Sequence, residues 1–149
     1  MFTSLLIAID GSELGDKALA AGIDLAQANT ARLLILTATD PVGTGLGTGG
    51  FGTIDASAML ARLEQTYAAQ ARALLDRARS RVEATGLKAD FVHVPRQRPA
   101  DAILAAAAER GIDLIVMGSH GRRGLGRLLL GSQAAEVLAR AEIPVLVVK

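Results

Sequence analysis

Residues 114–117, Leu114-Ile115-Val116-Met117, form an unbroken apolar run that ends at a glycine-rich segment. Similar short apolar runs occupy residues 5–9, residues 33–36 and residues 145–148, and a weaker one occupies residues 91–94. None of the four main runs alternates polar with apolar residues, which is typical of strands that are buried on both faces of a parallel sheet. The sequence therefore predicts a parallel sheet covered on both sides.

Helical patterns lie between these runs. Ser12 is expected to cap the first helix, and the longest helix is expected over about residues 57–84. Gly86 is expected to end that helix, Pro99 to begin the next one, and Ser132 to cap the last one. The predicted apolar stripe of the longest helix consists of Leu60, Leu63, Tyr67, Ala71, Leu74, Ala78 and Val82.

Strand and helix patterns alternate along the chain in the order βαβαβαβαβ, which predicts an α/β fold with a doubly wound parallel sheet. Right-handed crossovers place helices on both faces of such a sheet. With 149 residues, the chain is expected to form one domain over residues 1–149. The linker-like stretch is the glycine-rich segment 41–56, which we expect to be a flexible loop, with a lid over a bound ligand as the alternative.

The composition excludes several classes of function. A net charge of +1 disfavours a nucleic-acid-binding protein. The absence of cysteine excludes a disulfide scaffold, a thiolate zinc site and a cysteine nucleophile. No apolar run approaches the ~20 residues of a membrane span, and the first ten residues lack the basic region of a signal peptide. We therefore expect a cytoplasmic protein that contacts neither nucleic acid nor membrane.

Ligands of open α/β sheets bind beyond the carboxyl ends of the strands, so the loop after residues 114–117 is informative. Five of the 16 glycines fall in residues 118–131, just before the last predicted helix. Bare backbone N–H groups and a helix N-terminus bind anions. Ser132 adds a hydroxyl donor, and Arg122 and Arg123 add positive charge. This loop favours a phosphate-bearing ligand; the alternative is that its glycines only form turns and its arginines form a solvated rim.

Asp10 follows the first predicted strand, where its carboxylate can accept hydrogen bonds from two ribose hydroxyls. The structural alternative is a turn residue that holds Gly11 and Ser12 in place. His120 is expected to be a loop residue rather than a general base, and His93 a structural residue of its strand. The sequence contains no evident carboxylate pair, Ser-His-Asp set or metal cluster, so we expect neither a catalytic residue nor a metal site.

A signature of the form G-x2-G-x9-G-[ST] is complete in this chain as Gly118, Gly121, Gly131 and Ser132. The signature, together with residues 7–12, 99–103, 113–117 and 143–148, strongly resembles the universal stress protein family. The resemblance covers nearly the whole chain.

This resemblance implies that the protein binds ATP, either alone or together with Mg²⁺. It also implies a flavodoxin-like sheet with the strand order 3-2-1-4-5, as in the adenine nucleotide alpha hydrolase-like proteins. It also implies a homodimer joined through the last strand, Val145–Val148. In nucleotide-binding members, the acidic residue that matches Asp10 contacts the ribose, and the residue that matches Ala38 offers its backbone to adenine. The residues that match Gly121, Gly131, Ser132 and Gln133 surround the phosphates. The implied ATP contacts are Asp10, Ala38, Met117, Gly118, Gly121, Arg122, Arg123, Gly131, Ser132 and Gln133.

Two functions follow from the resemblance. The first is an ATP-binding regulatory protein of the stress response, and the alternative is a slow ATP-hydrolysing enzyme. A nucleotidyl transferase of the related type would need His-x-Gly-His where this chain has Asp10-Gly11-Ser12. Family members often have a glycine just before the proline at position 99, whereas this chain has Arg96-Gln97-Arg98. Either that loop is rebuilt, or these arginines reach the nucleotide.

Overall fold

A computed structural model describes residues 1–42, 56–121 and 130–149. The predicted flexible loop 41–56 therefore lies, from residue 43 to residue 55, outside the described residues, as do Arg122 and Arg123. The strands of the described part are β1 (Ser4–Ala8), β2 (Arg32–Thr39), β3 (Ala89–Pro95), β4 (Leu114–Gly118) and β5 (Val145–Val148). Its helices are α1 (Glu13–Asn29), α2 (Ala56–Glu83), α3 (Pro99–Glu109) and α4 (Ser132–Arg140).

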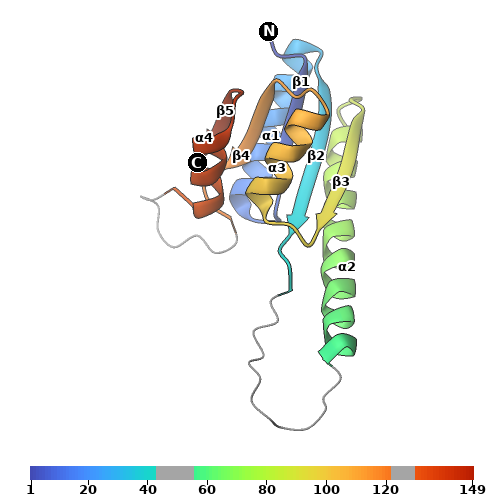
Figure 1. The fold of residues 1–149 in the computed structure, drawn as a ribbon. Coiled ribbons are helices and arrows are strands. Elements are labelled where there is room, and N and C mark those ends of the chain that lie inside the picture. The colour runs from blue at the N-terminus through green and yellow to red at the C-terminus, as the bar shows by residue number, and fades with distance from the viewer. Residues whose placement is uncertain (43–55, 122–129) are drawn as a thin grey trace.

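The five strands form one sheet of order β3-β2-β1-β4-β5, and every neighbouring pair is parallel (Figure 1). β1 lies at the centre, where Ile7 is in register with Ile35 of β2 and Val116 of β4. The order reverses between β1 and β4, so the switch point lies beyond their carboxyl ends. The predicted α/β fold and its strand order are confirmed.

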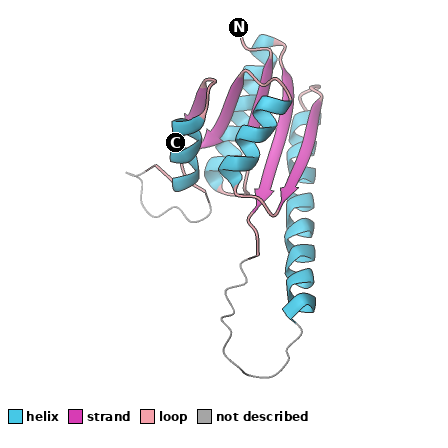
Figure 2. Ribbon diagram, viewed as in Figure 1, coloured by secondary structure: helices cyan, strands magenta, loops and turns pink. Residues whose placement is uncertain are grey.

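The helices cover both faces of the sheet (Figure 2). On one face, α1 and α2 pack against alternate residues of the central strands, such as Leu5, Ile7 and Ile35. On the other face, α3 and α4 pack against the residues between them, such as Leu6 and Leu36. Because side chains alternate across a strand, both sets must be apolar, which explains the unbroken apolar runs.

The structure extends two of the predicted strands. β2 continues to Thr39, beyond the predicted end at residue 36, and β3 spans Ala89–Pro95 instead of residues 91–94. The two strands pair along seven residues of each. Thr37 and Thr39 interrupt the apolar pattern, so periodicity alone ended the strand too early.

Helix α2 is longer than the sheet that it covers (Figure 1). Its 28 residues span roughly 42 Å, whereas the strands beneath it span about 26 Å. The predicted apolar stripe is buried at Ala71, Leu74, Ala78 and Val82, but it is exposed at Leu63 and half-exposed at Leu60. The first turns of the predicted stripe therefore lie outside the core, because no described strand lies beneath them.

Several predicted helix ends are confirmed. The Ser12 hydroxyl caps α1 by accepting a hydrogen bond from the Gly15 N–H at 3.0 Å. Gly86 follows α2 with a φ of +75°, a left-handed conformation that glycine adopts without strain. The predicted cap of α4 is wrong by one residue: Gly131 occupies the cap position with extended backbone, and Ser132 is the first helical residue. No helix of the described ranges is long and apolar enough to cross a membrane.

Candidate functional site

The carboxylate of Asp10 lies just beyond the carboxyl end of β1, between two glycines. Its Oδ1 atom accepts hydrogen bonds from the Ser12 N–H at 2.9 Å and from the Ser12 hydroxyl at 2.5 Å. A Cβ atom at Gly15 would lie 2.8 Å from Oδ1, and one at Gly121 would lie 2.8 Å from Oδ2. The turn role, which was the structural alternative to a ribose contact, is thus present, and the absence of side chains on both glycines makes room for the carboxylate.

Gly131, just before α4, lies against the residues that follow β4. The Gly131 N–H donates to the Ser119 carbonyl oxygen at 2.7 Å, and the Ser119 N–H donates to the Val148 carbonyl oxygen at 2.8 Å. A Cβ atom at Gly131 would lie 3.0 Å from the Ser119 carbonyl oxygen and 3.2 Å from Cα of His120. The glycine therefore lets the start of α4 approach the end of β4 closely.

Gly118 has a different role from the other glycines of the signature. A Cβ atom at this position would lie 2.9 Å from Cβ of Leu14 and about 3 Å from the Leu14 carbonyl group. Because these atoms include the backbone of α1, they cannot move aside cheaply. Gly118 allows α1 to pack against β4, so it shapes the site through the fold.

The N-terminus of α4 faces the site without a side-chain cap. Gly131 occupies the N-cap position of α4, and the described structure contains no side-chain cap hydrogen bond there. Arg98, at the N-cap position of α3, makes no such bond either. The first turn of α4 contains no acidic residue. Its first-turn backbone N–H groups have no partner within the helix, so together with the helix dipole they favour an anion.

Gln133 connects α4 to α3. Its side-chain oxygen Oε1 accepts a hydrogen bond from the Ala100 N–H at 2.9 Å. A first-turn N–H of α3 thus obtains the acceptor that Arg98, at the cap position, does not supply. Gln133 was predicted to lie beside phosphates, and in the structure its oxygen holds a neighbouring helix.

The arginines before α3 form ion pairs with other helices. Arg98 donates to Glu136 of α4, and Arg96 lies 3.9 Å from Glu64 of α2. Arg96 also adopts a φ of +54°, in the left-handed region. Neither arginine lines the cavity described below, so the structure favours the rebuilt loop over arginines that reach a ligand.

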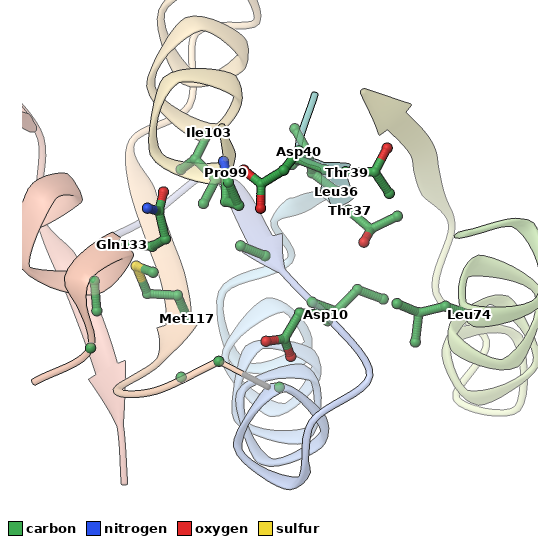
Figure 3. A pocket seen from close by; sticks show the side chains of 18 of the residues that line it. Asp10, Leu36, Thr37, Thr39, Asp40, Leu74, Pro99, Ile103, Met117 and Gln133 are labelled. Carbon is green, nitrogen blue, oxygen red and sulfur yellow. The ribbon is translucent and has the colours of Figure 1, made fainter. Parts of the chain in front are cut away.

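A cavity of about 400 Å³ lies over the carboxyl edge of the sheet (Figure 3). In Figure 3, Leu74 of α2 lies on one side of Asp10, and Met117 and Gln133 lie on the other. The predicted contacts that line this cavity are Asp10, Ala38, Met117, Gly118, Gly121, Gly131, Ser132 and Gln133. The structure thus brings together all predicted contacts that it describes.

The sequence did not identify several lining residues of this cavity. α2 contributes Tyr67, Gln70, Ala71 and Leu74. β2 and α3 contribute Thr37, Pro99 and Ile103. Tyr67 and Leu74 were predicted as members of the apolar stripe of the longest helix. No pattern in the sequence separates a stripe position that packs on the core from one that lines a cavity.

His120 lies in the wall of the cavity, with its Nδ1 atom 3.0 Å from the Ser119 hydroxyl. Its Nε2 atom is buried and has no hydrogen-bond partner among the described residues. The expected role of His120 as a loop residue stays a prediction. His93 of β3 pairs with the Thr39 hydroxyl at 2.9 Å, and burial lowers its pKa below 6.5. Among the described residues, no group of three or more His, Cys, Asp or Glu side chains is placed to hold a metal ion.

Comparison with known proteins places the chain among relatives of the same length. The model of the universal stress protein family matches residues 1–149. A universal stress protein of Thermus aquaticus, named for the QAH/OAS sulfhydrylase 3′ region, is 39% identical over 149 residues, which is 100% of both chains. These matches extend over the whole chain rather than over the glycine signature alone.

Solved structures agree with this assignment. The hypothetical protein MJ0577 of Methanocaldococcus jannaschii has a TM-score of 0.83 at 26% identity, covering 100% of this chain and 96% of that one. A universal stress protein solved in complex with cAMP has a TM-score of 0.68 at 28% identity, covering 99% of this chain and 96% of that one. The chain belongs to the universal stress protein family.

Proposed function

We propose that this protein binds ATP in the cavity at the carboxyl edge of the sheet and acts as a regulatory nucleotide-binding protein. The observation that carries the proposal is that one cavity contains Asp10, Gly121, Gly131 and the N-terminus of α4. The resemblance to nucleotide-binding members of the family supports ATP as the ligand. The similar protein solved in complex with cAMP supports an adenine nucleotide at this fold's site.

The end of the cavity at α4 fits phosphate. Gly121 and Gly131 leave the backbone bare, and the first turn of α4 adds N–H donors and contains no acidic residue. The Ser132 side chain is exposed at this turn, where its hydroxyl can donate to a phosphate oxygen. Arg122 and Arg123 remain predicted phosphate neighbours, and both lie outside the described residues.

Asp10 fits the ribose. Its carboxylate lines the cavity, and a carboxylate can accept hydrogen bonds from two ribose hydroxyls. Ala38 and Met117, with Pro99 and Ile103, give the adjoining wall of the cavity an apolar character. Bound ATP would supply negative charge at α4, with Mg²⁺ as a counter-ion.

The proposed regulatory role rests on the number of helices and strands that line the cavity. The cavity is lined by residues of β1, β2, β4, α2 and α4 together. A ligand that contacts all of them favours one arrangement of these elements over others by its differential affinity. We propose that this arrangement, rather than catalysis, is the output of ATP binding.

We also propose that the protein forms a homodimer through β5. This strand is at the edge of the sheet, and Leu146 is 37% exposed there. Leu138 of α4, the helix that precedes β5, is 43% exposed. An apolar edge strand offers unpaired backbone groups to a second copy.

Replacement of Ser132 by alanine tests the proposal with little risk to the fold, because the side chain is exposed. We expect ATP to raise the melting temperature of the wild type and to raise that of Ser132→Ala much less. Ser80→Ala is the matched control, since Ser80 is an exposed helical serine outside the cavity. If ATP stabilises Ser132→Ala as much as the control, the assigned phosphate end is wrong.

A further inference from the structure

The cavity extends to the face of the sheet that α1 and α2 cover. The resemblance assigns no role to the residues that line it on the α2 side. Leu36 and Met117 belong to the core beneath α3 and α4, whereas Ile9 and Leu74 belong to the core beneath α1 and α2. Thr37 and Thr39 alternate along β2 with Leu36 and so face α2. The lining residues on this side are Ile9, Thr37, Thr39, Tyr67, Gln70, Ala71 and Leu74.

The chemistry of this α2 side suits an uncharged ring. None of its seven lining residues is charged, whereas the opposite end offers the N-terminus of α4. Phosphates are therefore favoured at α4 and disfavoured at α2. Tyr67 is half-buried, and its aromatic face offers a stacking surface that any purine can use.

We infer that Tyr67 is a nucleotide-contact residue and that the base of the bound nucleotide packs against its ring. This inference rests on the proposed function, which it deepens by adding α2 to the binding site. A base against Tyr67 leaves Asp10 between the base and the phosphate end at α4, as Figure 3 shows for the order of Leu74, Asp10 and Gln133. The same base can direct an edge towards the backbone of Ala38, since that residue lines the same cavity.

The composition provides a direct probe of this contact. The chain contains one tyrosine and no tryptophan, so tyrosine emission comes from Tyr67 alone. We expect ATP to quench this emission with the midpoint that calorimetry gives for binding. Inorganic tripolyphosphate, which has no base, is expected to bind without quenching. Free tyrosine amide in the same ATP solutions corrects for absorption by the nucleotide.

Two variants separate the ring from the fold. Tyr67→Phe keeps the ring, and we expect its ATP affinity to stay within about twofold of the wild type. Tyr67→Leu removes the ring, and we expect its ATP affinity to fall by about tenfold or more, because base stacking on an aromatic side chain contributes about 1–3 kcal/mol. The tripolyphosphate affinity of both variants should match the wild type.

Each outcome of these titrations is decisive. If the wild type binds no ATP, the proposed function fails. If the wild type binds ATP but its emission is unchanged, the function stands and the assignment of Tyr67 is wrong. The assignment is also wrong if Tyr67→Leu binds ATP like the wild type, or if it loses ATP and tripolyphosphate affinity equally.

Discussion

The side-chain oxygen of Gln133 accepts a hydrogen bond from the backbone N–H of Ala100 at 2.9 Å, across 33 residues of sequence. This bond supplies an acceptor for the first turn of α3, which Arg98 leaves without a side-chain cap. It also joins α3 to the helix whose N-terminus faces the cavity. Gln133 thus links the position of the proposed phosphate end to the rest of the fold.

Gln133→Ala is expected to lower the free energy of unfolding by about 0.5–2 kcal/mol, the range for loss of a helix cap. The cause is the partly buried Ala100 N–H, which loses its acceptor. Urea unfolding at neutral pH measures this change. Gln27→Ala is the matched control, because the amide of Gln27 makes a longer, exposed hydrogen bond of 3.4 Å to Thr85. Equal stability of the two variants would refute the capping role.

Gly118→Ala is expected to destabilise the fold by about 1–3 kcal/mol, as overpacking does. The added methyl group would meet Leu14 of α1, including its carbonyl carbon and oxygen, at about 3 Å. Thermal unfolding without ligand measures the effect. Gly121→Ala is the comparison, since among the described residues its methyl group would meet only the Asp10 carboxylate. We expect Gly121→Ala to lose less stability and more ATP affinity, and the reverse order would contradict this reading of the two glycines.

These two glycines show how far the sequence predicts the site. The spacing of the signature places both beside the switch point, and the structure confirms that both line one cavity. Spacing does not distinguish a glycine that makes room for α1 from one that makes room for a carboxylate. That difference depends on which element packs behind each residue, and this is a tertiary property.

The fold was more predictable than the site because its determinants are local. Apolar runs with no alternation indicate buried parallel strands, and Gly86 marks the end of α2 through a positive φ. The wall formed by Tyr67 and Leu74 is not local, because it depends on where β2 ends beneath α2. The contact between Gln133 and Ala100 is likewise invisible in any short pattern.

Asp113 makes the stability of the fold depend on pH. Burial raises the pKa of Asp113, but hydrogen bonds from the N–H and hydroxyl of Thr3 and from the Ser4 N–H outweigh burial and lower it below 3.8. The stabilisation is therefore fully present above about pH 4 and is lost as the pH falls through the folded-state pKa.

Asp113→Asn is expected to be less stable than the wild type at pH 7, with a difference that shrinks below about pH 4. Urea unfolding across this range measures the difference. Asp24→Asn on the exposed side of α1 is the control, and its difference from the wild type should not follow this trend. A pH-independent difference for Asp113→Asn would contradict the assigned role.

Leu146→Glu is expected to convert the proposed dimer into a monomer, because it places a charge on the apolar edge strand. Light scattering at micromolar concentration measures the mass of each species. Met59→Glu introduces the same charge at a 48% exposed residue of α2, away from β5, and should remain dimeric. A monomeric wild type, or a Leu146→Glu variant that remains dimeric, would rule out assembly through β5.

The most direct test of ATP binding is a calorimetric titration of ATP into the nucleotide-free protein, with and without Mg²⁺. The account predicts saturable binding with about one ATP per chain, which Asp10→Asn weakens while its retained Oδ1 acceptor preserves the turn with Ser12. No binding heat and no thermal stabilisation by ATP, either with or without Mg²⁺, would contradict the central claim.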